Sequence, residues 1–305
     1  MCLNRNTRGV ILIMLAASSF GLVPLAAKIA YANGLTPYSF ILFRSIIAAI
    51  ALFALLKHKR TGLRMPPGHM TTLFKASFFG YCMMMITLYV AYNYMASGIA
   101  TTVHYVYPVA TMIGAVLFYG EAINPRKIAA LLVSLIGIYL LVGGVASSGF
   151  SMIGASLAFV SGLFYAYYIL TVSYSGIKNM NSSVLVFYVS VFNAVTLFVI
   201  CFFTGDLTLD FNATALVSVL AITLVVNILG MVALQEGLKI IPPSTATILS
   251  TFEPLTSLVI GVALLNETLS WYHGAGSVLV LISVVWVAWS EKQASTPDTT
   301  IQIPR

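Results

Sequence analysis

Long apolar segments separated by short polar breaks run along the whole chain. Each is long enough for a helix that crosses a bilayer, which needs roughly 20 apolar residues. The segments are too long and too uniformly apolar for the alternating strands of a membrane β-barrel, which have about ten residues. We therefore predict an all-α polytopic membrane protein. Its ten predicted spans are 10–32, 38–56, 73–95, 97–119, 127–143, 152–173, 184–204, 213–238, 244–265 and 272–290.

The breaks between the predicted spans carry residues that favour turns, among them Asn33-Gly34 and Pro242-Pro243. No break is long enough for a soluble domain. The first span follows Arg5 and Arg8, as a signal peptide would, but it is too long for the apolar region of one and lacks a small-residue cleavage site. We predict that it is retained as a helix.

Composition agrees with a membrane setting. With 60% apolar and only 8% charged residues, the chain has too few polar groups to cover a surface that faces water. The net charge of +7 could indicate nucleic-acid binding, but the basic residues are distributed by membrane side. We therefore predict no nucleic-acid partner, and a cationic face that meets anionic lipid.

The basic residues fix the predicted orientation, because Lys and Arg resist translocation and stay in the cytoplasm. With ten spans, thirteen of the 15 fall on one face, and the exceptions are Lys28 and Arg44 inside the first two spans. Both termini are therefore predicted to be cytoplasmic. The thirteen are Arg5, Arg8, Lys57, Lys59, Arg60, Arg64, Lys75, Arg126, Lys127, Lys178, Lys239, Lys292 and Arg305.

The chain contains two copies of one unit. Pro108 precedes Glu121 by thirteen residues, and Pro254 precedes Glu267 by the same interval, 146 residues further on. Five spans per copy is an odd number, so the second copy enters the membrane the other way up. Inverted repeats are the structural basis of alternating access in many transporters. The predicted units are an N-terminus 1–9, a first repeat 10–143, an inverted second repeat 152–290 and a cytoplasmic tail 291–305.

This order of elements resembles the drug/metabolite transporter superfamily and, within it, the bacterial EamA-type exporters. The residues that carry the resemblance are Phe20-Gly21 with Pro24, Arg44, Ala91-Tyr92-Asn93, Pro108, Glu121, Gly137, Gly162 with Tyr165-Ala166-Tyr167, Ala233-Leu234-Gln235, Glu253-Pro254 and Glu267. The resemblance implies a secondary carrier of the inner membrane that moves amino acids or other small metabolites, mostly outward, through a central cavity between two halves. The fifth and tenth spans would be peripheral.

Glu253 is the strongest candidate for a functional residue, since an ionisable group deep in a membrane is retained only with a partner or a water-filled cavity. It lies about 13 Å along the ninth span, at 1.5 Å per residue. A carboxylate there could bind a substrate amine or carry a proton. The alternative is a purely structural carboxyl, hydrogen-bonded to neighbours such as Ser250 and Ser257. Pro254 next to it, like Pro24 and Pro108, is predicted to bend its helix.

His104 and Arg44 lie about 10 Å from the outer ends of their spans. His104 could relay protons, or could be a neutral structural histidine bonded to a serine or tyrosine. Arg44 cannot discharge, so it must find a carboxylate, free carbonyls or an anionic substrate group, or snorkel to the headgroups. We favour a structural or gating role for Arg44.

Aromatic and amide side chains complete the predicted cavity. Tyr107 is the repeat counterpart of Glu253, which places a phenol and a carboxylate at equal depth in opposite halves. Such a lining suits a small amphipathic or zwitterionic ligand. Ordinary aromatic packing is the alternative for several of these residues. The further candidates are Tyr89, Asn93, Tyr165, Tyr168, Asn227 and Gln235.

Enzyme motifs are not found in the sequence. The cysteines have no metal or disulfide spacing, and no phosphate-binding glycine loop or paired-carboxylate motif occurs, so we predict no catalytic residues, cofactor or metal. The predicted function is a proton-coupled exporter of an amino acid or related metabolite, as a monomer or homodimer. The alternatives are an uncoupled facilitator of the same fold and an intramembrane enzyme or scaffold.

Overall fold

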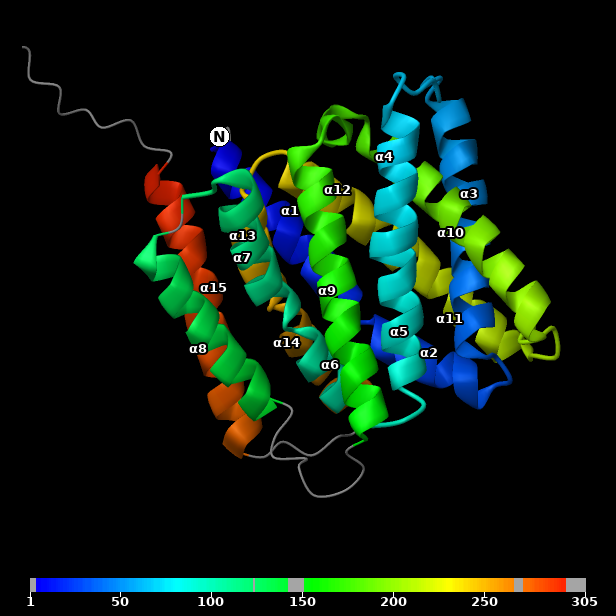
Figure 1. Ribbon diagram of the computed structural model, residues 1–305. Coiled ribbons are helices and arrows are strands. Elements are labelled where there is room, and N and C mark those ends of the chain that lie inside the picture. Colours follow the sequence, from blue (N-terminus) through cyan, green and yellow to red (C-terminus); the bar gives the residue numbers. More distant parts are fainter. Residues whose placement is uncertain (1–3, 123, 142–150, 266–270, 295–305) are drawn as a thin grey trace, which may run out of the picture.

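The structure is a computed structural model that describes residues 4–122, 124–141, 151–265 and 271–294. All regular secondary structure within these ranges is helical, which confirms the predicted all-α class (Figure 1). The first half contains α1 (Arg5–Phe20), α2 (Val23–Ala32), α3 (Pro37–His58), α4 (His69–Lys75), a π-helical segment (Ala76–Cys82), α5 (Met83–Ala91), α6 (Ser97–His104), α7 (Tyr107–Tyr119) and α8 (Pro125–Leu141).

The second half repeats this order, except that one continuous helix and a 3-10 turn take the place of α1 and α2. It contains α9 (Met152–Tyr174), a 3-10 turn (Gly176–Asn179), α10 (Ser182–Thr204), α11 (Ala213–Ile222), a second π-helical segment (Thr223–Gly230), α12 (Met231–Leu238), α13 (Pro243–Ser250), α14 (Glu253–Leu265) and α15 (Trp271–Ala294). Adding 146 to the bounds of α6 and α7 gives the bounds of α13 and α14. The structural repeat thus has the same period as the sequence repeat.

Three helices are interrupted two or three residues before a proline. The breaks lie between α1 and α2, between α6 and α7, and between α13 and α14, ahead of Pro24, Pro108 and Pro254. Proline lacks the backbone N–H and its ring clashes with the preceding turn, so the helix hydrogen-bond ladder cannot run through it. The breaks therefore follow from the sequence.

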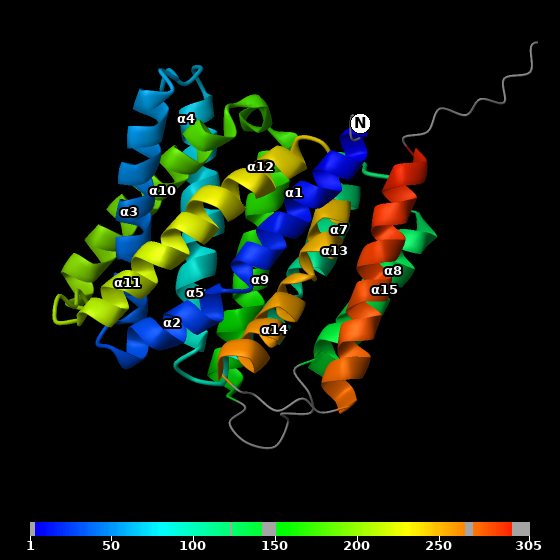
Figure 2. The ribbon, with the colours of Figure 1, turned by 180° about the vertical axis from the view of Figure 1, so that it is seen from behind.

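Helices α8 and α15 lie side by side at one edge of the molecule (Figures 1 and 2). A Cβ on Gly276 would lie 2.6 Å from the carbonyl oxygen of Gly137, and the Ser283 hydroxyl donates to the Ala130 carbonyl over 2.7 Å. From Gly276 to Ser283 the residue numbers of α15 rise, while those of their partners in α8 fall from Gly137 to Ala130, so the two helices are antiparallel. The offset of 146 exchanges these two contacts, as expected for counterparts in an inverted repeat.

Within the described residues, eight helical stretches are long and apolar enough to cross a membrane. They are Arg5–Ala32, Pro37–His58, His69–Ala91, Ile99–Tyr119, Met152–Tyr174, Ser182–Thr204, Ala213–Leu238 and Trp271–Ser290. The two other predicted spans correspond to α8, with 17 residues, and to α13 with α14.

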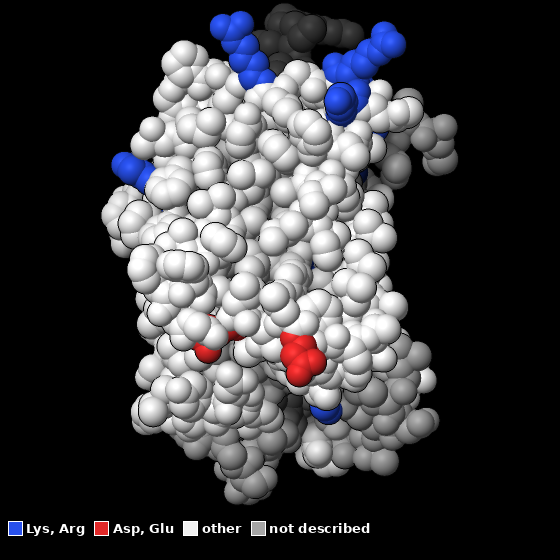
Figure 3. Space-filling model, turned by 90° about the vertical axis from the view of Figure 1, so that its right-hand side faces the viewer, with Lys and Arg blue, Asp and Glu red and all other residues white. Residues whose placement is uncertain are grey.

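Charge is concentrated toward the ends of the helix bundle. Lys57, Lys59, Arg60 and Arg64 are exposed at the end that also carries the start of α1, which we call the basic end. On the face shown in Figure 3, acidic side chains lie toward the other end and a broad band between is largely uncharged. Large apolar side chains such as Leu117 and Phe203 are exposed, as lipid contact requires.

Candidate functional site

A cavity lies inside the bundle where the helix breaks meet α3 and α5. It holds about 510 Å³ of empty space, part of it open to the outside. The lining residues are Phe20, Val23, Pro24, Arg44, Tyr81, Met84, Met85, Leu88, Tyr89, Tyr92, His104, Tyr165, Val226 and Glu253. Both halves of the chain contribute.

The break in α1–α2 packs directly against the break in α13–α14. A Cβ on Gly21 would lie 2.6 Å from the backbone oxygen of Glu253, so only glycine allows this approach. The Ser257 hydroxyl donates to the Gly21 carbonyl over 2.6 Å. The prolines therefore bring two irregular backbones together at the cavity, where freed carbonyls have polar partners.

Glu253 begins α14 and lines the cavity, with its side chain partly accessible. The two serines that were predicted as hydrogen-bond partners of Glu253 donate to backbone carbonyls instead. Ser250 donates to the Ala246 carbonyl and Ser257 to the Gly21 carbonyl. The Tyr105 hydroxyl faces the carboxyl, and it makes no well-directed hydrogen bond within the described residues. The carboxyl is thus placed to meet a ligand or water in the cavity.

Arg44 is buried, with 1% of its surface exposed, and it lines the same cavity. Its Nη1 donates to the Tyr89 hydroxyl and its Nη2 to the Asn227 side-chain oxygen, both over 2.8 Å. The guanidinium carbon lies 5.3 Å from the centre of the Phe40 ring. Arg44 therefore points inward and bridges the two halves, and it does not snorkel to the membrane surface.

The two π-helical segments supply the surroundings of Arg44. Asn227 lies in the second segment, and its repeat counterpart Tyr81 lies in the first and lines the cavity. A π-helical turn adds one residue and changes the direction of the side chains that follow, and such turns are frequent at functional sites. Both segments thus turn a polar side chain toward the interior.

His104 lines the cavity and has a partner in α9. Its Nδ1 lies 2.7 Å from the Ser161 hydroxyl, and that hydroxyl donates its single proton to the Ala158 carbonyl over 2.6 Å. Ser161 must therefore accept from His104, which places a proton on Nδ1. This is the serine-bonded arrangement that the structural interpretation of His104 requires.

The other predicted site residues divide into two groups. Tyr89, Tyr165 and Pro24 line the cavity. The remainder lie outside its lining: Tyr107 is buried against His104 and Tyr165, Tyr168 accepts a 2.7 Å hydrogen bond from Gln235, Pro108 is buried in α7, and Asn93 is exposed after α5. Asn227 reaches the cavity through Arg44.

Several cavity residues were not predicted from the sequence. Tyr81 and Phe20 line the cavity, as do the sulfur side chains of Met84 and Met85. Tyr81 could have been predicted from the repeat, because it lies 146 residues before the candidate Asn227. Methionines in a uniformly apolar helix carry no such signal.

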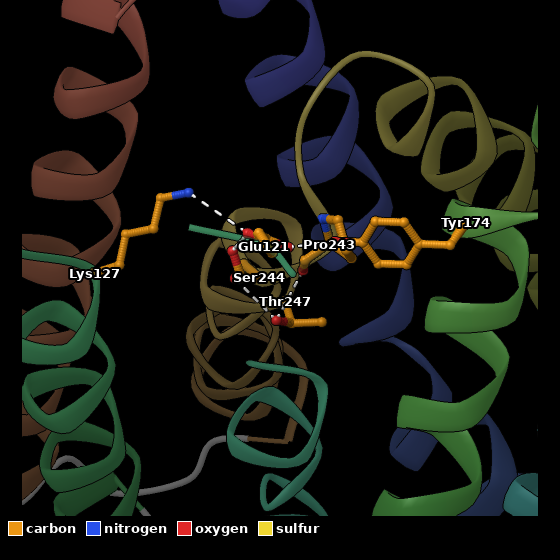
Figure 4. Close-up of polar contacts among 6 residues, drawn as sticks. All are labelled: Glu121, Lys127, Tyr174, Pro243, Ser244 and Thr247. Atoms are coloured by element: carbon orange, nitrogen blue, oxygen red, sulfur yellow. Dashed lines mark hydrogen bonds and ion pairs between the residues drawn. The ribbon is translucent and has the colours of Figure 1, made fainter. Parts of the chain in front are cut away.

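A second polar cluster lies at the basic end. Glu121 follows α7, and Figure 4 shows it between the side chains of Lys127 and Tyr174. Its Oε2 accepts a 2.7 Å hydrogen bond from Tyr174, its Oε1 accepts from Ser244, and Lys127 Nζ lies 3.8 Å from Oε1. This cluster, which we call the Glu121 latch, joins the end of α7 to the second-half helices α9 and α13.

The chain has no candidate metal centre in the described ranges, where no three His, Cys, Asp or Glu side chains cluster. Cys82 and Cys201 are buried free thiols. The arrangement offers instead one cationic and one carboxyl side chain on a cavity of aromatic character.

Comparisons with known proteins agree with this geometry. Residues 7–143 and 152–289 each match the EamA-like transporter family. A solved structure described only as the crystal structure of a protein superposes with a TM-score of 0.80 at 16% identity, covering 92% of this chain and 97% of its own, so it shares the fold. No curated protein matches the chain. Two family matches that span nearly all of the sequence make the protein a member of the EamA-like transporter family and hence a multi-pass membrane transporter.

Proposed function

We propose that the protein is a secondary active transporter that exports an amino acid or a related small metabolite across the inner membrane, coupled to protons through Glu253. One observation carries the proposal: Glu253 is partly accessible in a cavity formed where broken helices of two inverted repeats meet. Transporters of this kind place their substrate site at such a repeat interface, built from discontinuous helices.

The proposed topology has ten spans with both termini in the cytoplasm. It is supported by the exposed cations of the basic end, since Lys and Arg collect in cytoplasmic loops. Helix α8 counts as a span because its counterpart α15 packs antiparallel along it. Under this orientation the basic end faces the cytoplasm.

Alternating access is supported by the position of the cavity, which is closer to one end of the helix bundle than to the other. Arg44 is the eighth residue of α3, which places it about 10 Å from the start of that helix and about 20 Å from its end at Lys57 and His58. The cavity therefore lies nearer the end opposite the basic end, while the Glu121 latch joins the two halves at the basic end. Exporting a substrate requires a second state in which that latch opens.

The alternative of an uncoupled facilitator predicts the same fold and cavity. The two differ in the role of Glu253, which a coupled carrier must protonate and deprotonate in each cycle and a facilitator need not. An intramembrane enzyme would need several reactive groups converging at one depth, whereas the cavity presents Glu253 and a histidine already bonded to Ser161.

Reconstituted liposomes test the proposal. Wild-type protein should accumulate a radiolabelled amino-acid mixture when a proton gradient is imposed, and Glu253→Gln should lose accumulation while keeping its thermal stability. Asp210→Asn is the matched control, because it neutralises an exposed carboxylate at the opposite end from the latch. Wild-type accumulation by Glu253→Gln would remove this residue from the coupling mechanism.

A further inference from the structure

We propose that Arg44 binds an anionic group of the transported compound, so that the cavity selects substrates that carry a carboxylate or a comparable anion. The proposal rests on the transport function and names the chemical class that the site accepts. It replaces the structural or gating role that the sequence favoured. Its starting point is a charge that the protein itself leaves uncompensated.

The guanidinium of Arg44 is buried without a carboxylate partner among the residues that the structure describes. Moving a charge out of water costs several kcal/mol, and a neutral hydrogen-bond acceptor recovers only part of that cost. The partners of Arg44 are the neutral Tyr89 hydroxyl and Asn227 amide, with the faces of Phe40 and Tyr89 nearby. Neutral acceptors and aromatic rings orient a cation but do not cancel its charge.

The hydrogen-bonding capacity of Arg44 is also unused in part. A guanidinium has five N–H donors in a planar fork, and Arg44 uses one on each terminal nitrogen. Its Nε is buried and has no partner in the described part of the chain. The free donors include an N–H on Nε and one on each terminal nitrogen, which is the set that a carboxylate accepts in bidentate fashion.

The two existing hydrogen bonds prepare Arg44 for this role. They come from opposite halves of the chain, Tyr89 in α5 and Asn227 in the second π-helical segment, and they hold the guanidinium plane at the cavity wall. A binding group that is already ordered loses less conformational freedom when the ligand arrives. Arg44 is thus a fixed receptor for an anion.

The cavity also has an acidic side. Glu253 lines the same cavity as Arg44, and Tyr81 and Tyr92 line it with them. A compound with a carboxylate at one end and an ammonium at the other would match both. Its apolar part would contact the rings and methionines of the lining.

Ligand-induced stabilisation of the purified protein tests the proposal. The probes are the twenty standard amino acids and the amides of the same compounds, which keep the ammonium and the side chain but lack the carboxylate. At least one acid should raise the melting temperature of the wild type by several degrees, and its amide should not. Amides that stabilise as well as acids, or a full set of acids without effect, would overturn the proposal.

Two substitutions link this selectivity to Arg44. Arg44→Gln should weaken binding of the stabilising acid about tenfold or more, since it removes a charged bidentate contact. Asn227→Asp places a carboxylate 2.8 Å from Arg44, so it should stabilise the empty protein and abolish the effect of the acid. Asn179→Asp, at an exposed position in the 3-10 turn after α9 and outside the cavity lining, is the control and should behave like wild type.

The second substitution keeps the test informative if Arg44→Gln fails to fold. An Asn227→Asp protein that is less stable without ligand, or that is still stabilised by the acid, would show that the charge of Arg44 does not require an anionic partner. Selective binding without flux in liposomes would support this proposal while contradicting the transport proposal. Flux in liposomes without discrimination between acid and amide would support the transport proposal while contradicting the role of Arg44.

Discussion

At the residue scale, the site combines side chains that the sequence could identify with contacts that it could not. Glu253 was predicted from depth alone, because a carboxyl in an apolar helix needs a reason to be there. Arg44 was identified by the same logic, but its partner Asn227 is 183 residues away. No local pattern connects them, so the bond that positions Arg44 required the folded chain.

Loss of the Tyr89 hydroxyl should weaken substrate binding more than it weakens the fold. Tyr89→Phe leaves the ring in place but removes the acceptor for Arg44 Nη1. Without this acceptor the guanidinium must be ordered when the ligand arrives, which costs about 0.5–1.5 kcal/mol, so we expect roughly two- to tenfold weaker binding. Equilibrium binding measures this, with Tyr94→Phe at an exposed position as the control. Equal affinities for the two variants would contradict the role of Tyr89.

At the element scale, the helix breaks were predictable and the π-helical segments were not. Proline marks a break by its missing N–H, and Pro24, Pro108 and Pro254 all follow one. The segments Ala76–Cys82 and Thr223–Gly230 contain no such residue. They occupy corresponding places in the two halves, so only comparison of the folded repeats reveals that they are a shared feature.

Gly21 should not tolerate a side chain, because it separates the two broken helices. Gly21→Ala would place a Cβ 2.6 Å from the Glu253 backbone oxygen and 2.8 Å from the Thr256 Cβ. Overpacking of this kind costs about 1–3 kcal/mol, and here it also shifts Glu253. We expect a lower melting temperature and reduced flux. Gly62→Ala meets no atom within 4 Å and should change neither; equal behaviour of the two variants would contradict the packing argument.

The Glu121 latch should control opening of the basic end. Glu121→Gln weakens its contacts with Tyr174 and Ser244, which join the two halves, so we expect the state open to that end to become more populated. Labelling of Thr247→Cys by a membrane-impermeant thiol reagent measures this accessibility. Glu236→Gln is the control, because the partners Ser182 and Lys239 lie in the same half as Glu236. Labelling that rises equally in both variants would contradict the latch.

At the scale of the whole molecule, the sequence was sufficient for the fold class and the family. Apolar segments of span length predicted the helices, and the interval from Pro108 to Glu121, which occurs twice, predicted the repeat. Both signals can be read from short stretches of the sequence. The shape of the cavity was not predictable. It depends on which faces of distant helices meet, and a uniformly apolar helix does not show in sequence which face is turned to lipid. Asn93, expected near the cavity, is exposed because α5 ends at Ala91 and does not continue to residue 95 as predicted.

The α8–α15 pair offers a test of the repeat at this scale. Gly137→Ala would place a Cβ 2.9 Å from the Val280 backbone nitrogen, so it should separate the helices and lower the melting temperature. Gly274→Ala lies in α15 with no atom within 4 Å, and alanine is favoured over glycine in helices by up to about 1 kcal/mol. It should be neutral or stabilising. A tolerated Gly137→Ala would contradict the close antiparallel packing.

The central claim is that Glu253 carries the proton that drives transport through the cavity. The most direct measurement is internal pH in liposomes that hold a pH-sensitive dye, after an amino-acid gradient is imposed with no initial proton gradient. Wild-type protein is expected to move protons together with its substrate, and Glu253→Gln is expected to move none. A wild-type proton signal from Glu253→Gln, or substrate flux by the wild type without any change in internal pH, would contradict it.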